Sequence, residues 1–333
     1  MRALVLHAPA PIETAPLRVE TVADPVPAAD EIVLEISVCG ICRTDLHVVE
    51  GDLAPRSGPV IPGHQVVGRV AERGPQARRF GPGERVGVAW LHRSCGSCEF
   101  CRADRENLCR APLFTGYSAP GGFAERVAVP EAFAYPIPDA FSDEQAAPLL
   151  CAGIIGYRAL RRSHVESGQT LGLYGFGSSA HIALQLARHR GCRVLVCTRD
   201  ARARKLALEL GAAWAGGADE PPPEPLDGAI LFAPVGTLVP PALRALRPGG
   251  TLACAGIHLS EIPPLDYAST LFDERTLTSV TANTREDGRE LLAAAAEIPI
   301  QPRTTAFPLE QANEALAQLK NDGIRGSGVL TVS

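Results

Sequence analysis

The sequence predicts an α/β protein with a β-rich first part and a doubly wound parallel sheet in its second part. Short β-rich runs separated by turn residues lie at 31–38, 66–72, 85–90 and 123–129. From about residue 144, strand-like and helix-like runs alternate instead. A chain of 333 residues is also longer than one core usually grows, which favours two domains.

The second part starts with a predicted helix at 144–160. A strand, a tight turn, a helix and a second strand follow over 170–197, which is a βαβ unit. The remaining predicted elements are a helix at 201–211, a proline-rich loop at 221–227, a strand at 228–233, a helix around 240–250, a strand at 251–256, helices at 289–297 and 309–320, and a strand at 328–332. This alternation indicates a parallel, doubly wound sheet.

Charge and composition limit the possible partners. The formal net charge is −5 and 21% of the residues are charged, so no basic field attracts nucleic acid or anionic lipid. The first sixteen residues, MRALVLHAPAPIETAP, do not resemble a signal peptide, and no apolar run has the length that spans a bilayer. We therefore expect a cytoplasmic protein whose ten cysteines stay reduced, available for metal binding or catalysis.

Four cysteines lie within fifteen residues, in the pattern Cys-x2-Cys-x2-Cys-x7-Cys formed by Cys95, Cys98, Cys101 and Cys109. Four thiolates on so short a loop are typical of a closed, structural zinc site. An iron–sulfur cluster is the alternative, although bacterial clusters use a final gap of three residues followed by proline. Either metal group implies little about the reaction.

A glycine-rich turn, Gly175-x-Gly177-x-x-Ala180, follows an apolar strand and opens a helix. Gly175 permits the tight turn, Gly177 lets backbone amides approach a pyrophosphate, and Ala180 allows close packing of the helix on the strand. The phosphates would bind at the helix N-terminus, where unpaired amides and the helix dipole favour anions. The turn predicts a bound nicotinamide dinucleotide.

The end of the next strand bears on the choice of cofactor. An acidic residue about 20 positions after the turn usually holds the adenosine ribose and repels a 2′-phosphate. Here the residues are Thr198, Arg199 and Asp200. A hydroxyl and a guanidinium favour NADP over NAD. In the alternative interpretation, Arg199 is a solvated loop charge and Asp200 binds the ribose of NAD.

Several motifs in order resemble the zinc-containing alcohol dehydrogenases of the medium-chain dehydrogenase/reductase superfamily, and the resemblance covers nearly the whole chain. The motifs are CGICRTDLHVVEGD, IPGHQVVG, GPGERVGV, GGFAE, LLCAG and IRGSGVL, together with the four-cysteine lobe and the glycine turn. The resemblance implies a GroES-like catalytic domain formed by 1–150 and 290–333, with a Rossmann dinucleotide-binding domain at 151–289 between the two segments.

The resemblance also implies a catalytic zinc held by Cys42, His64 and Cys151. Three protein ligands with one open position are typical of a catalytic zinc site. Asp45 would orient His64 by binding its other ring nitrogen.

Further residues match the family's proton relay and its cofactor contacts. Thr44 would take the alcohol proton, which a cofactor ribose hydroxyl passes on to His47 and then to water. Arg43 and Arg325 match positions that hold the cofactor pyrophosphate, and either could instead be a surface charge.

Three residues near the predicted zinc need separate comment. Gln65 stands where the family usually has glutamate, which removes a negative charge beside the metal. Trp90 matches a substrate-pocket position and would narrow the pocket toward short or planar alcohols, or it belongs to the core. Cys39 and Cys42 spell Cys-x-x-Cys, but they follow a β-rich run, so we expect Cys39 to be a buried packing residue.

The resemblance implies a zinc-dependent enzyme that interconverts an alcohol and its aldehyde or ketone by reversible hydride transfer with NAD(P). Thr198 and Arg199 favour NADP as the cofactor. An NADPH-dependent aldehyde reductase or a polyol dehydrogenase would share these ligands. A zinc- and NADPH-binding sensor without turnover and an iron–sulfur electron carrier are alternatives of another class. By analogy we expect a homo-oligomer, either a tetramer or a dimer.

Overall fold

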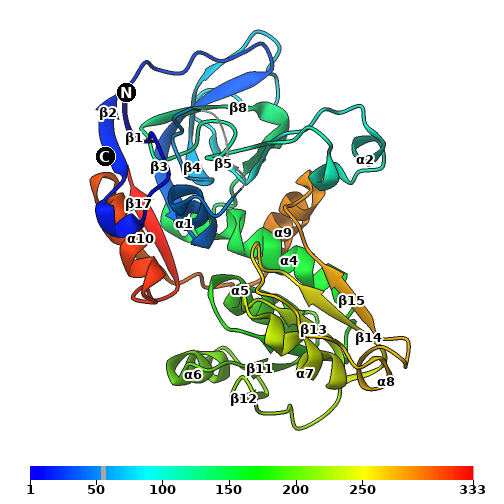
Figure 1. Ribbon diagram of the computed structural model, residues 1–333. Coiled ribbons are helices and arrows are strands. Elements are labelled where there is room, and N and C mark those ends of the chain that lie inside the picture. Colours follow the sequence, from blue (N-terminus) through cyan, green and yellow to red (C-terminus); the bar gives the residue numbers. More distant parts are fainter. Residues whose placement is uncertain (54–57, 333) are drawn as a thin grey trace. The chain divides into compact units, whose positions relative to one another are not determined.

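The computed structural model describes residues 1–53 and 58–332 (Figure 1). The chain divides into two compact units. The first consists of Met1–Cys151, Ala282–Glu297 and Gln301–Ser333, and the second of Ala152–Thr281 and Ile298–Ile300. The domain boundaries expected from the sequence, at 150/151 and 289/290, stay predictions.

The second unit is built on a parallel sheet with the strand order β12-β11-β10-β13-β14-β15. Its strands are β10 (Thr170–Tyr174), β11 (Arg193–Cys197), β12 (Trp214–Gly216), β13 (Leu226–Leu231), β14 (Leu246–Cys254) and β15 (Thr276–Ser279). The order reverses direction between β10 and β13, so the predicted doubly wound sheet is confirmed. The central strand β10 is buried along its whole length, because helices cover both faces of such a sheet.

Helices connect these strands. They are α4 (Ala152–Arg162), α5 (Ser178–His189), α6 (Ala201–Glu209), α7 (Val239–Arg244) and α8 (Tyr267–Thr270), with a 3-10 turn η5 at Gly236–Leu238. Ala180, Ala183 and Ala187 are buried on α5. Small residues on this face of α5 allow the helix to pack closely on the sheet.

The first unit contains a mainly antiparallel sheet with the order β16-β17-β3-β4-β5-β9, and β8 pairs with β3. Its strands and those of two smaller sheets are β1 (Arg2–Leu6), β2 (Leu17–Thr21), β3 (Glu31–Ile41), β4 (Gln65–Arg73), β5 (Arg85–Val88), β6 (Leu91–Arg93), β7 (Leu113–Phe114), β8 (Arg126–Pro130), β9 (Ala134–Pro136), β16 (Thr304–Pro308) and β17 (Ser327–Thr331). β3 is the central strand, and its apolar side chains form the middle of this unit's core.

The helical elements of the first unit are short apart from three. They are α1 (Arg43–Glu50), α2 (Glu99–Arg102), α3 (Asp143–Ala146), α9 (Arg285–Glu297) and α10 (Ala312–Lys320), with 3-10 turns η1 (Ile12–Thr14), η2 (Glu106–Leu108), η3 (Glu131–Phe133), η4 (Ala147–Leu150) and η6 (Leu309–Gln311). α10 is joined to the sheet core through Ala312, Ala315 and Leu316.

Two predicted helices are wrong in extent. The helix expected at 144–160 is divided into α3, η4 and α4, because Pro148 lacks the amide that would continue the α-helical ladder. Cys151 lies at the second break, with φ −129° and ψ −73°. The helix expected around 240–250 ends at Arg244, and β14 starts at Leu246. Gly249 has φ +76°, which a helix does not contain.

Among the described residues, no helix combines the length and the apolar character that crossing a membrane requires.

The four-cysteine lobe, which runs from Cys95 to Cys109, is tied to α9 by a buried ion pair. The Glu106 carboxylate is 5% exposed and accepts hydrogen bonds from the backbone amide and from Nε of Arg285, both at 3.0 Å. Burial raises the pKa of Glu106, but the Arg285 amide and guanidinium outweigh burial and hold the pKa below its usual value. The resulting stabilisation is therefore present above the unfolded pKa and is lost as the pH falls through the folded pKa.

We predict that Glu106→Gln destabilises the protein by about 1–3 kcal/mol at pH 7, because hydrogen bonds to a charged group are lost. Thermal unfolding followed from pH 7 down to pH 3 should show the two proteins converging at the acidic end. Glu99→Gln, which removes a carboxylate paired with Arg110 on the exposed surface of the same lobe, is the control and should change the melting temperature little. A difference between wild type and Glu106→Gln that does not vary with pH would contradict the assignment.

Candidate active site

Cys42 lies where β3 ends and α1 begins. It is the N-cap residue of α1, in an extended conformation, and its Sγ accepts the Thr44 amide at 3.3 Å. Sequence analysis missed α1, although the segment carries a capping box in which cysteine takes the usual place of serine or threonine. Gly51, with φ +83°, ends the helix and was the second available signal.

Asp45 joins the two neighbouring ligand candidates. Its Oδ2 accepts the Cys42 amide at 2.8 Å, and its Oδ1 lies 2.9 Å from Nδ1 of His64. The side chains of Asp45 and His64 are at most 2% exposed. The carboxylate thus makes Nδ1 the protonated nitrogen. It leaves the Nε2 lone pair to bind a metal, 3.5 Å from Cys42 Sγ.

Cys151 completes the group from a distant part of the chain. Its position between η4 and α4 brings its Sγ to 3.9 Å from Cys42 Sγ, and the three donor atoms of Cys42, His64 and Cys151 lie within 4.8 Å of one another. In a tetrahedral zinc site, sulfur and nitrogen ligands are separated by about 3.6–3.8 Å. The measured separations therefore fit one zinc ion, with one tetrahedral position left for another ligand.

The charges at this group favour a cation. Burial disfavours a charged His64 ring, but Asp45 and Cys42 outweigh burial and raise the pKa of His64 to about 10. The hydrogen bond from Cys151 holds the pKa of Cys42 well below that of a free thiol, while the same bond raises the pKa of Cys151. A bound divalent cation can replace the protons on these thiols and on the imidazole, because it supplies the positive charge that stabilises their deprotonated forms.

The two residues predicted for the proton relay both lie on α1. Thr44 is half-buried, and His47 follows it by one helical turn. His47 Nδ1 lies 2.7 Å from Asp52 Oδ2, a partner that sequence reasoning missed. This contact holds the His47 ring at the end of α1.

The two arginines predicted to hold pyrophosphate are exposed in the same unit. Arg43 donates to Asp322 at 2.7 Å, and this ion pair lies on the surface. Because surface ion pairs contribute little stability, Arg43 can exchange Asp322 for a phosphate at low cost. Arg325 is exposed near the start of β17. The cofactor role of both residues stays a prediction.

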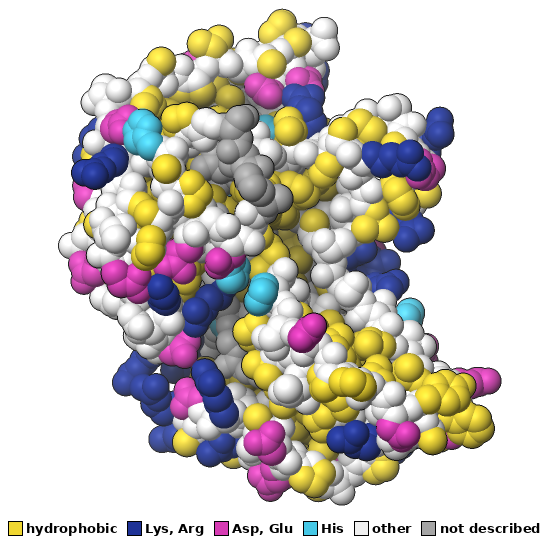
Figure 2. Space-filling view, viewed as in Figure 1, with side chains coloured by type: hydrophobic (Ala, Val, Ile, Leu, Met, Phe, Trp, Pro, Cys, Tyr) yellow, Lys and Arg dark blue, Asp and Glu magenta, His cyan; other side chains and the backbone are white. Residues whose placement is uncertain are grey.

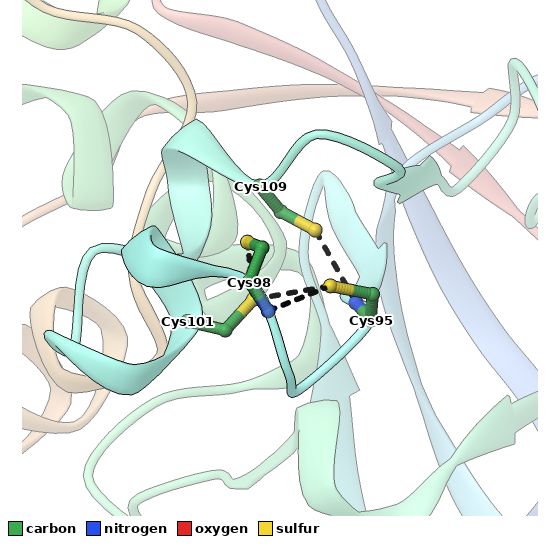
Figure 3. Close-up of side chains that lie close together, drawn as sticks. All are labelled: Cys95, Cys98, Cys101 and Cys109. Atoms are coloured by element: carbon green, nitrogen blue, oxygen red, sulfur yellow. Dashed lines mark hydrogen bonds between the residues drawn. The ribbon is translucent and has the colours of Figure 1, made fainter.

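The four cysteines of the lobe face one another (Figure 3). Cys101 Sγ lies 3.9 Å from Cys95 Sγ and 3.6 Å from Cys98 Sγ, as the edges of a tetrahedral zinc site require. Backbone amides donate to Cys95 and Cys109, and the Ser97 and Cys98 amides lower the pKa of Cys95 to about 6. These donors stabilise thiolates, so the lobe fits a closed four-sulfur zinc site.

In the second unit, the glycine turn has the conformation that a dinucleotide requires. Gly175 has φ +87°, and a Cβ there would lie 2.8 Å from the Ala233 amide. Gly177 is the N-cap residue of α5, and a Cβ there would meet nothing within 4 Å. The open space in front of the first turn of α5 fits a pyrophosphate. Ala180 is fully buried.

The carboxyl end of β11 lies beside this turn, since the Gly175 amide donates to the Cys197 carbonyl at 2.8 Å. Thr198 is 7% exposed and Arg199 is exposed. The Asp200 carboxylate caps α6 by accepting the Arg202 amide at 2.9 Å. Its oxygen is therefore engaged within the chain.

Gln65 is buried directly after His64. It pairs with Gly40 across β3 and β4, and a Cβ at Gly40 would lie 2.9 Å from Gln65 Oε1. Within the described residues, the Gln65 Nε2 has no hydrogen-bond partner. A neutral amide, rather than a carboxylate, therefore occupies the strand next to the metal ligand.

Aromatic rings adjoin His64 on one side. The His64 ring meets Trp90 edge-on, with 5.1 Å between centroids, and Trp90 stacks with Phe114 at 5.0 Å and with Tyr117 at 5.9 Å. Trp90 is half-buried and also packs against the core. Phe114 and Tyr117 were not foreseen, because nothing in their spacing relates them to Trp90.

Cys39 does not form part of the metal group. Its Sγ is fully buried and contacts the backbone of Gly63 and Gly122 so closely that a Cβ at either glycine would lie 2.9 Å from it. The expectation of a buried packing residue is confirmed.

Comparison with known proteins gives consistent results. Residues 28–139 match the family described as alcohol dehydrogenase GroES-like domain, and residues 180–297 match that described as zinc-binding dehydrogenase. The chain is 52% identical to the probable alcohol dehydrogenase AdhA of Mycobacterium tuberculosis, over 100% of this chain and 97% of that protein. It is 33% identical to an alcohol dehydrogenase of Geobacillus stearothermophilus, over 94% and 95% of the two chains. A solved cinnamyl alcohol dehydrogenase from Sorghum bicolor superposes with a TM-score of 0.89 at 26% identity, covering 98% of this chain and 97% of the other.

We predict that Cys42→Ser binds one zinc per chain where the wild type binds two, while its melting temperature changes little, because a serine hydroxyl can still accept the Thr44 amide and cap α1. Cys98→Ser should instead lower the melting temperature markedly, since the lobe loses its closed metal site. Elemental analysis and thermal unfolding of the two variants test this. Equal loss of stability in both would contradict the division into one open and one closed site.

We predict that Asp45→Asn weakens zinc binding at the Cys42 group by about 10–100-fold, because the carboxylate orients His64 and caps Cys42. The measurement is zinc retention during titration with a chelator. Asp52→Asn, the same substitution just after α1 at a carboxylate that contacts no ligand, is the control. If Asp45→Asn and Asp52→Asn lose zinc at the same chelator concentration, the proposed role of Asp45 is refuted.

Proposed function

The chain belongs to the zinc-containing alcohol dehydrogenase family, and on that premise we propose that it interconverts an alcohol and its aldehyde or ketone by hydride transfer, with NADP as preferred cofactor. The observation that carries this proposal is the three-donor group of Cys42, His64 and Cys151. It leaves one tetrahedral position open, whereas the four-cysteine lobe leaves none.

The two donor sets are the catalytic and the structural zinc site of this family. When bound, zinc acts as a Lewis acid on the substrate oxygen. Cys42 and Cys151 provide two sulfur donors that balance the charge of the ion. Asp45 fixes the protonation of His64 and so keeps its Nε2 directed at the site.

Thr44 and His47 are the groups that we propose for moving the substrate's hydroxyl proton. The Thr44 hydroxyl can accept one hydrogen bond while it donates another. The imidazole of His47 can accept and release a proton, and its contact with Asp52 orients the ring.

The preference for NADP rests on the end of β11. Thr198 stands at the place where an acidic residue would hold the ribose, and Arg199 is an exposed cation next to it. Asp200, the residue that would favour NAD, is engaged in capping α6. A guanidinium is suited to phosphate oxygens, which supports NADP.

The aromatic group of Trp90, Phe114 and Tyr117 bears on the substrate. Because Trp90 contacts His64, we propose that large side chains limit the space beside the metal and favour short or planar alcohols. An aldehyde reductase or a polyol dehydrogenase would use the same ligands, and a panel of alcohols, aldehydes and polyols distinguishes these activities. We also propose a homo-oligomer, a tetramer or a dimer, located in the cytoplasm.

We predict that kcat/KM with NADP(H) exceeds that with NAD(H) by about tenfold or more, as one favourable phosphate contact implies. The experiment is a panel of short, branched, aromatic and polyol substrates, as alcohols and aldehydes, measured with both cofactors by nicotinamide absorbance. Equal or better use of NAD would refute the NADP preference. The absence of turnover with every substrate, in a protein that holds two zincs, would favour the non-catalytic sensor.

A further inference from the structure

The turn that follows β11 is held by an arginine that faces the backbone. Arg204, in the second turn of α6, donates from Nη1 to the carbonyl oxygens of both Thr198 and Arg199, at 2.8 and 3.1 Å. Its side chain is half-buried. One guanidinium nitrogen therefore restrains two consecutive peptide groups of the turn.

The same turn is held from two other sides. The Thr198 amide donates to the Gly216 carbonyl at 3.0 Å, and the Gly175 amide donates to the Cys197 carbonyl at 2.8 Å. The glycine turn, the end of β11 and the start of α6 thus form one hydrogen-bonded assembly. Arg204 is the member of this assembly that fixes the carbonyls of Thr198 and Arg199, and with them the directions in which the two side chains leave the backbone.

Cations gather around this place. Arg199 and Lys205 are exposed, and Lys and Arg side chains cluster at the lower left of Figure 2, where α6 lies in Figure 1. Of the nearby acids, Asp200 accepts the Arg202 amide with one oxygen, which lies 3.6 Å from the Arg202 guanidinium, and Glu220 accepts the Gly217 amide at 3.0 Å. The local charge is therefore positive, as a bound phosphate monoester requires.

We propose that Arg204 is a positioning residue for the adenosine 2′-phosphate of NADP: it orients Thr198 and Arg199, which contact the phosphate, and does not itself bind the phosphate. This inference rests on the proposed NADP preference and extends it. The guanidinium is already engaged with two carbonyls, so its contribution comes from ordering the turn before the cofactor arrives. A preordered turn saves the entropy that a flexible loop would lose on binding.

Arg202 offers a matched control on the same helix. Arg202→Ala removes the same charge from α6, but its side chain is 79% exposed and contacts no carbonyl of the turn among the described residues. Arg204→Lys keeps the charge, but its side chain is shorter and does not carry a nitrogen to the position of Nη1, which bonds both carbonyls, so it separates charge from geometry.

The test compares adenosine 2′,5′-bisphosphate with adenosine 5′-monophosphate by calorimetry on the full-length, zinc-loaded protein. The ratio of the two dissociation constants isolates the 2′-phosphate. In Arg204→Ala we expect the bisphosphate to bind about tenfold more weakly and the monophosphate to change less than about twofold. Arg202→Ala should leave both within about twofold, and Arg204→Lys should recover only part of the loss. Turnover at saturating NADPH should be unchanged, with the effect confined to KM.

The outcomes separate the two proposals. A wild-type protein that binds the two nucleotides equally refutes the NADP preference itself, and with it the role of Arg204. A wild type that prefers the bisphosphate, with Arg204→Ala and Arg202→Ala equally impaired, refutes the positioning role alone, because charge then explains the effect. If Arg204→Lys binds the bisphosphate as tightly as the wild type, charge alone likewise explains the effect and the positioning role is refuted. If Arg204→Ala melts below the assay temperature, Arg204→Lys decides by itself, since full affinity there overturns the inference.

Discussion

The Asp45 carboxylate is the interaction on which the metal site depends. One oxygen caps the first turn of α1 through the Cys42 amide, and the other holds the His64 ring nitrogen that faces away from the metal. A single buried side chain thus sets the start of a helix, the conformation of one ligand and the protonation of another. Its burial raises its own pKa, and the His64 ring and the Cys42 amide offset only part of this electrostatic cost.

The two groups of cysteines use the same sulfur ligand in two kinds of metal site, one structural and one with an open position. In the lobe, four thiolates come from one short loop, and backbone amides donate to their sulfurs. All four tetrahedral positions are filled, so the ion stabilises the loop. At Cys42 and Cys151 the donors come from a helix start and from a break between helices, and only three positions are filled. The open position distinguishes a reactive site from a structural one.

In the second unit the proposed binding site is formed mainly by the backbone, whereas in the first unit side chains form the metal sites. Gly175 and Gly177 leave space at the first turn of α5, and the end of β11 lies against that turn through the Cys197 carbonyl. Parallel strands bring their carboxyl ends to one edge of the sheet, where the order of the strands reverses. We propose that cofactor selectivity depends on a few residues after β11, and α6 contributes directly to their conformation through Arg204 and the Asp200 cap.

The sequence by itself determined the two-part organisation, the parallel sheet and the four-cysteine lobe, because periodicity and cysteine spacing are local properties of the chain. The set of Cys42, His64 and Cys151 followed from the resemblance to the family. The strand order and the division of the 144–160 helix at Cys151 were decided by tertiary structure. Pro148 limits a helix locally, but only packing determines that the resulting break brings Cys151 to Cys42. The partners of His47, Trp90 and Arg204 likewise depend on distances between atoms. Contacts such as Arg204 with two carbonyls leave no periodic trace in the sequence, so no pattern of residues could have indicated them.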